Sequence, residues 1–149
     1  QGRHLDACRE MLLDPHTVSG LSDAGAHVNF ICDMSNPTFH LTHWVRDRSR
    51  GERLPIEAVV AKATGVPARL YGFTDRGTLR VGQRADINIV DLERLHIDIP
   101  RLRNDLPAGG QRFVQLASGY VATIVNGVTV RQGDTDTGAR PGRVVRPTR

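Results

Sequence analysis

Apolar positions recur every three or four residues near the start of the chain, and this spacing predicts an amphipathic helix over residues 3–13. A short run of apolar and small residues follows at 17–22, without the alternation of a half-exposed strand. A helix that leads directly into such a run is typical of a buried parallel sheet, whose strands are covered on both faces. This part of the chain is therefore predicted to be α/β.

Two further helices are predicted in the first half of the chain. The first begins at Ser35-Asn36-Pro37, because asparagine can accept a backbone hydrogen bond as N-cap and proline is pre-set for the first helical position. Pro55 opens the second helix, and Gly65 is its expected C-cap. Trp44 lies on the apolar face of the first helix and is predicted to be core, together with Phe39.

The second half of the chain alternates apolar with polar residues, a period typical of β-strands. Two strands are predicted around 79–81 and 87–89, and residues 100–112 are predicted to form a polar surface loop. Two alternating runs then flank Asn126-Gly127, a dipeptide that accepts the positive φ angles of a type I′ turn. Residues 120–131 are therefore predicted to form a β-hairpin.

Composition excludes several classes of function. The net charge is +4, but the basic residues are scattered and almost all arginine, and aromatic residues are only 5% of the chain. Nucleic-acid binding needs clustered cations, and RNA stacking needs interleaved aromatics, so we expect no nucleic-acid partner. No apolar stretch approaches the roughly 18 residues of a membrane span, so we expect no membrane partner.

The cysteines and the first residue bear on location and completeness. Cys8 and Cys32 have no CxxC spacing, and no signal peptide precedes them, so we expect two reduced thiols and a cytoplasmic protein. The chain begins with Gln1 rather than methionine, which favours an origin inside a longer polypeptide.

Candidate chemistry gathers in Ser-Asp-Ala-Gly-Ala-His, residues 22–27, where the predicted strand ends. Asp23 and His27 would leave its carboxyl end, the edge of an α/β sheet at which active sites usually lie. Taken from the residues alone, Asp23 is equally well a turn cap. His40 and His43 have a helical spacing that can chelate metal, but a third ligand is needed. Arg46 and Arg48 could bind a substrate carboxylate, although a solvated helix end explains them too.

Four segments together resemble the C-terminal part of the N-acyl-D-amino-acid deacylases, the D-aminoacylase-like branch of the amidohydrolase superfamily. The likeness runs from about residue 10 to the end of the chain. The segment Gly-x-Leu-x-x-Gly-x-x-Ala-Asp marks the superfamily, whereas Ser-Asp-Ala-Gly-Ala-His and the tail are specific to the deacylase branch. The segments are 13–28, 41–47 (Leu-Thr-His-Trp-Val-Arg-Asp), 75–86 and 137–144.

The resemblance implies a fold and a site. Residues 1–72 would be the last strand and flanking helices of a (β/α)8 barrel, and 73–149 part of a small β-sandwich with the tail. Asp23 would be the catalytic aspartate, in contact with one or two zinc ions or their water. From their positions in the chain rather than from the resemblance, we expect His27 and Arg46 to contact substrate. The reaction would be hydrolysis of an N-acyl-D-amino acid to a carboxylate and a D-amino acid.

The other metal ligands of that family are absent from these 149 residues. Three protein ligands are the usual minimum for a catalytic zinc, so this chain alone is expected to be inactive. The remainder of the same polypeptide or a companion chain would supply them. Two alternatives stay open: another amidohydrolase, such as a dihydropyrimidinase-like enzyme or a deaminase, and a non-catalytic β-rich interaction module.

Overall fold

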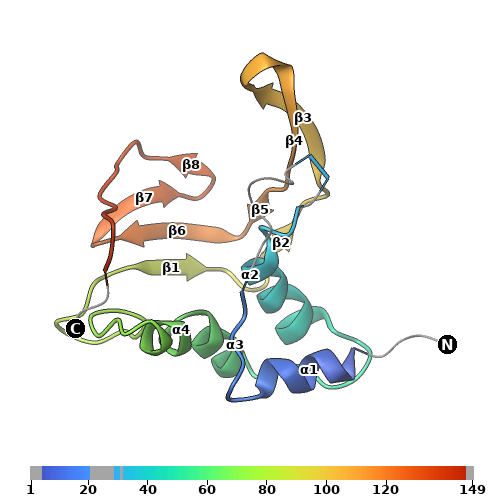
Figure 1. Ribbon diagram of the computed structural model, residues 1–149, viewed down its shortest axis with the longest axis vertical. Coiled ribbons are helices and arrows are strands. Elements are labelled where there is room, and N and C mark those ends of the chain that lie inside the picture. Colours follow the sequence, from blue (N-terminus) through green and yellow to red (C-terminus); the bar gives the residue numbers. More distant parts are fainter. Residues whose placement is uncertain (1–4, 21–28, 31, 147–149) are drawn as a thin grey trace.

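The protein was analysed as a computed structural model, which describes residues 5–20, 29–30 and 32–146. Helices lie along one side of a four-stranded sheet, and a separate two-stranded ribbon projects away from both (Figure 1). The helical elements are α1 (Asp6–Leu13), α2 (Asn36–Phe39), η1 (His40–Asp47), α3 (Ile56–Ala63), α4 (Gly65–Leu70) and η2 (Pro107–Gly109). The strands are β1 (Ile87–Val90), β2 (His96–Ile97), β3 (Arg101–Leu106), β4 (Gly110–Val114), β5 (Ala117–Ser118), β6 (Tyr120–Val125), β7 (Val128–Gln132) and β8 (Thr135–Asp136).

The predicted helices are confirmed, but the expected C-cap at Gly65 is wrong, because Thr64 is the C-cap of α3 and Gly65 is the first residue of α4. The first is α1, and Pro55 occupies the N-cap of α3 as the sequence indicates. Asn36 is the first residue of α2 rather than its cap, because Ser35 takes the N-cap position. The helix then continues into η1, a π-helix in which the amide of Arg48 donates to the carbonyl of His43, five residues earlier.

A small cluster of buried apolar side chains lies within the helical layer. Three side chains form it, each no more than 6% exposed: Trp44 of η1, Leu54, which precedes α3, and Val59 of α3. Cys8 and Leu12 on one face of α1 pack against it, so the amphipathic spacing of α1 serves to bury this cluster. Full burial of side chains of this size stabilises a fold by roughly 1.5–3 kcal/mol each.

Lys62 of α3, the only lysine of the chain, ties α3 to the segment that follows α1. Its ammonium donates hydrogen bonds to the carbonyl oxygens of Asp14 and Thr17, and a longer one of 3.2 Å to the Thr17 hydroxyl. An ammonium carries three donors, and here each of them has an acceptor. The segment leading into residue 20 is therefore fixed from α3.

Two predicted strands are wrong for the residues that the structure describes. Residues 17–20 have no strand conformation, and 21 and 22 lie outside the described part of the chain. Residues 79–81 lie in an exposed turn, with Leu79 79% exposed and Val81 fully exposed. A strand needs a neighbour to accept its backbone hydrogen bonds, and among the described residues neither segment has one.

The four-stranded sheet has the order β1-β6-β7-β8, and all of its strand pairs are antiparallel. It contains the predicted hairpin: β6 and β7 pair across Asn126-Gly127, with Val125 opposite Val128. The φ angles of Asn126 and Gly127 are 51° and 79°, the left-handed values that a type I′ turn requires.

The ribbon contradicts the predicted loop at 100–112. β3 and β4 pair antiparallel, with Leu102 opposite Phe113 and Arg103 opposite Arg112. Every residue of β3 is exposed, so no face of the strand had to be apolar and no alternation signalled it. The reversal at the tip uses positive φ angles at Ala108 and Gly109.

Charged side chains hold the β6–β7 turn against the residues that lead into β1. Asp86 accepts a hydrogen bond of 2.7 Å from the amide of Asn126, whose side-chain oxygen accepts one of 3.0 Å from Arg84. Arg84 also donates a hydrogen bond of 2.6 Å to the Asp75 carboxylate. The Arg76 guanidinium forms ion pairs with both carboxylates, at 3.0 Å to Asp75 and 3.3 Å to Asp86. The network thus links three separate stretches of chain.

This network predicts a loss of stability in acid. Hydrogen bonds from Arg76 and then Arg84 lower the pKa of Asp75 from 3.8 to about 2. Because the folded-state pKa is below the unfolded one, the carboxylate stabilises the fold above about pH 4, and this contribution disappears as the pH falls towards 2. Between pH 5 and 2, the unfolding midpoint of the Asp75→Asn variant should therefore fall less than that of the wild type.

The matched control is Asp134→Asn, because the Asp134 carboxylate has no hydrogen bond to any described residue. Its unfolding midpoint should fall with the wild type across the same pH range. An Asp75→Asn profile parallel to the wild type would show that Asp75 does not contribute.

Candidate functional site

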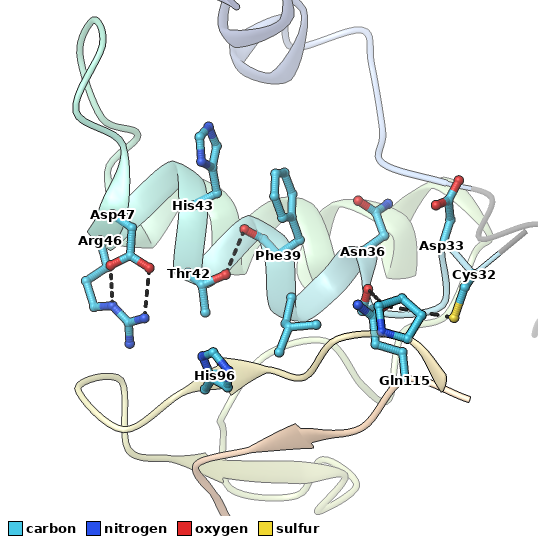
Figure 2. Close-up of a pocket in the computed structure, with 13 residues that line it drawn as sticks. Cys32, Asp33, Asn36, Phe39, Thr42, His43, Arg46, Asp47, His96 and Gln115 are labelled. Atoms are coloured by element: carbon cyan, nitrogen blue, oxygen red, sulfur yellow. Dashed lines mark hydrogen bonds and ion pairs between the residues drawn. The ribbon is translucent and has the colours of Figure 1, made fainter. Parts of the chain in front are cut away.

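A pocket of about 750 Å³ lies between the α2–η1 helix and the short β2–β5 pair (Figure 2). Figure 2 shows the helix along one side and His96 with Gln115 along the other, with Cys32 and Asp33 at one end. Carboxylates, imidazoles and two side-chain amides are mixed with apolar groups, a lining that suits a small polar molecule. The lining residues are Cys32, Asp33, Ser35, Asn36, Phe39, Thr42, His43, Arg46, Asp47, His96, Ile97, Pro100 and Gln115.

The two sides of the pocket are joined at one end by Gln115, which lies between β4 and β5. Its side-chain oxygen accepts a hydrogen bond of 2.6 Å from the hydroxyl of Ser35, and its amide nitrogen donates one of 2.9 Å to the carbonyl of Asp98. A second link lies nearby, where the buried Thr38 of α2 and Tyr120 of β6 hydrogen-bond through their hydroxyls at 2.8 Å. Residues about 80 positions apart in sequence thus fix this wall.

Arg46 joins the two sides at the other end of the pocket. Its guanidinium binds Asp47 through two hydrogen bonds of 2.6 and 2.8 Å, visible in Figure 2. Its third nitrogen donates to main-chain carbonyls of the loop before β2, including that of Leu95 at 2.8 Å. The Asp47 hydrogen bond raises the pKa of Arg46, and Arg46 lowers the pKa of Asp47.

The carbonyls that Arg46 binds belong to a loop held by close packing. Leu95 is 1% exposed, and a side chain at Gly119 would place its Cβ 2.6 Å from the Leu95 Cα. Gly119 also has a φ of 93°, so glycine is required there on two counts. The structure therefore gives Arg46 a scaffolding contact, and its contact with substrate stays a prediction.

His43 and Phe39 project from the same side of the helix in Figure 2. Their rings stack at 4.9 Å with an interplanar angle of 7°, and Trp44 meets His43 edge-on at 5.1 Å. Phe39 is 41% exposed and lines the pocket, so the prediction that it is core is wrong, whereas Trp44 is confirmed as core. Burial lowers the pKa of the neighbouring His40, which favours its neutral form.

Asp23 and His27, the candidate catalytic and substrate-binding residues, lie outside the described residues. Within the described ranges, no three His, Cys, Asp or Glu side chains are arranged to hold a metal ion. The His40–His43 pair accordingly has no described third ligand. The residues that the structure describes do not by themselves fit a catalytic metal.

Sequence reasoning missed the pocket residues contributed by the second half of the chain, above all Gln115 and His96. His96 is an isolated histidine in a two-residue strand, and its side chain is 69% exposed. Gln115 follows the segment that was predicted to be a loop. No local pattern could indicate either residue, because their significance arises from contact with the distant helix.

Comparison with known protein families places the chain in a class of hydrolases. The profile of the Amidohydrolase family matches residues 1–131, so the chain belongs to the amidohydrolase family. That family has an α/β fold and generally depends on metal, and the described mixture of helices and antiparallel strands is compatible with part of it.

Curated relatives narrow the likeness to one branch. Three proteins of Alcaligenes xylosoxydans xylosoxydans resemble the chain: an N-acyl-D-glutamate deacylase at 37% identity, an N-acyl-D-aspartate deacylase at 35% and a D-aminoacylase at 32%. The alignments cover 71%, 71% and 70% of this chain, but only 19%, 20% and 19% of the respective relatives. The resemblance to D-aminoacylase-like amidohydrolases is thus confirmed, for a chain that spans about a fifth of those relatives.

No solved structure matches the chain. Within the described ranges, no helix is both long and apolar enough to cross a membrane.

Proposed function

We propose that this chain is the C-terminal portion of a zinc-dependent enzyme that hydrolyses the amide bond of N-acyl-D-amino acids, releasing a carboxylate and a D-amino acid. The observation that carries the proposal is the likeness to three relatives whose names all denote deacylation of D-amino acids or aminoacylase activity on them. Membership of the amidohydrolase family supports the same type of reaction.

The proposal extends to the fold and to the residues. Residues 1–72 would complete a (β/α)8 barrel, and 73–149 would form part of a β-sandwich. Asp23 would take a proton from the attacking water and return it to the leaving amine, a role that suits a carboxylate beside a metal site. The other zinc ligands would come from outside this chain, because three ligands are the usual minimum. His27 and Arg46 would contact the substrate.

The test presents the complete protein with a panel of N-acyl amino acids and measures the free amino acid that is released. We expect turnover of N-acetyl-D-amino acids, little turnover of their L-enantiomers, and none of cyclic amides such as dihydrouracil. Zinc analysis of the purified protein accompanies the assay. The 149-residue chain alone is expected to be inactive.

Two results would overturn the proposal. Preferential hydrolysis of cyclic amides would place the protein among the ring-opening amidohydrolases. Stoichiometric zinc or turnover with the 149-residue chain alone would show that the ligand set lies within it.

A further inference from the structure

Gln115 has contacts that a surface glutamine does not need. Its amide uses both ends at once: the oxygen accepts from Ser35 at 2.6 Å, and the nitrogen donates to the Asp98 carbonyl at 2.9 Å. The Cys32 thiol lies 4.0 Å from the same oxygen. The backbone of Asp98 is itself paired, because its amide donates to the Leu116 carbonyl at 2.8 Å. Gln115 therefore connects the segment at 32–35 to a backbone position that is already fixed.

The Ser35 hydroxyl binds Gln115 and does not cap the helix that begins beside it. Serine is among the preferred N-cap residues, because its hydroxyl normally accepts a hydrogen bond from an amide of the first helical turn. Ser35 stands at the N-cap of α2, yet its side chain makes no capping hydrogen bond. Its hydroxyl is turned towards Gln115 instead, and both residues are only partly buried. The helix start is thus oriented by a contact with the β region.

The wall that Gln115 fixes belongs to the pocket. Cys32 and Asp33 line it at one end, and Gln115 lines it from the opposite side. Ser35 is also a lining residue. Neutral glutamine suits this place, because it can donate to one partner and accept from the other, whereas glutamate would set a negative charge against the Asp98 carbonyl.

We propose that Gln115 is a positioning residue: through Ser35 it holds the pocket wall formed by residues 32–35, and so sets the geometry in which substrate reacts. The inference rests on the proposed deacylase function. It assigns Gln115 no contact with the reacting atoms. Since a misplacement of about 1 Å can reduce catalysis by about 100-fold, loss of this contact should act mainly on kcat.

The test uses the complete protein with Gln115→Leu and Ser35→Ala. Each is expected to lower kcat per folded molecule by roughly 10- to 100-fold, with a smaller change in KM. The double variant should be little worse than Gln115→Leu alone, because Gln115→Leu already removes the contact with Ser35. Ser35→Thr keeps the hydroxyl and should be markedly more active than Ser35→Ala.

The matched control is Gln111→Leu, the same substitution at an exposed position of β4. It should leave kcat and the unfolding temperature near those of the wild type. The inference is overturned if Gln115→Leu lowers the unfolding temperature while kcat per folded molecule stays unchanged, since Gln115 would then serve stability alone. Additive effects of the two single variants would also overturn it, because they would show that Ser35 and Gln115 act independently.

A second measurement separates this inference from the proposed function. Amide hydrogen exchange in peptides that contain Ser35 should be faster in Gln115→Leu than in the wild type, and unchanged in Gln111→Leu. If the wild-type protein hydrolyses no N-acyl-D-amino acid, the proposed function fails, and exchange alone decides whether Gln115 holds the wall. Unchanged exchange in Gln115→Leu would overturn the inference whatever the enzyme's substrate.

Discussion

Replacing Asp23 by asparagine in the complete protein is expected to lower kcat for N-acyl-D-amino acid hydrolysis by about 10²- to 10⁴-fold, the usual contribution of a general acid–base residue. Asparagine has nearly the same shape as aspartate, but it cannot accept the proton of the attacking water. Folding and zinc content should stay close to those of the wild type, which circular dichroism and metal analysis would check.

The control for Asp23→Asn is again Asp134→Asn, an equivalent change at an exposed carboxylate next to β8. Its kcat should equal that of the wild type. Substantial turnover by folded, zinc-loaded Asp23→Asn would exclude Asp23 as the proton acceptor. Loss of zinc from that variant would instead identify Asp23 chiefly as a ligand.

The second large effect is expected at a buried arginine. The Arg48 side chain is 2% exposed, lies over the Trp44 ring at 4.7 Å and donates to the carbonyl of Arg50 at 2.6 Å. Its charge is balanced by Asp6 of α1, with which it forms an ion pair. Asp6→Ala would leave this guanidinium buried without its counter-charge, and should lower the free energy of unfolding by about 3 kcal/mol. We place the effect at the low end of the usual range because the Asp6 carboxylate is 54% exposed.

A double variant makes the reason for this loss testable. Asp6→Ala combined with Arg48→Met removes both charges while methionine keeps much of the apolar volume against Trp44, so it should be more stable than Asp6→Ala alone. Glu10→Ala is the control, because Glu10 is an exposed carboxylate on the same helix without an ion pair to a described residue. Urea unfolding midpoints of the complete protein provide the comparison. A double variant less stable than Asp6→Ala would show that packing of Arg48, rather than its unpaired charge, controls the effect.

Local signals in the sequence predicted those elements whose cause is local. Pro55 starts α3 and Asn126-Gly127 forms the hairpin turn, because each depends on the backbone preference of one or two residues. The strand expected at 79–81 required a partner that is absent from the described residues, and the β3–β4 ribbon has no buried face to reveal it. Pairing between strands is a long-range property, and alternation signals it only when one face is covered.

For the site, too, local signals could be predicted from the sequence and long-range contacts could not. The resemblance indicated Asp23, and the residue pattern added His27 and Arg46. The structure describes only Arg46 of the three, and it shows the contacts of Arg46 with Asp47 and the loop carbonyls. Gln115 could not be predicted, because its meaning depends on Ser35, 80 residues away. Ser35 was read as part of a helix start, which is correct, but its hydroxyl is used elsewhere.

The single lysine gives the chain an unusual chemical simplicity. Among these 149 residues, an amine-reactive reagent can modify one lysine side chain, Lys62. The carbonyls of Asp14 and Thr17 accept hydrogen bonds from its ammonium. Acylation would remove its charge and two of its three donors, so the label would release the contact at the moment it forms. The labelling rate at Lys62 would therefore report how often α3 separates from the segment that leads towards residue 20.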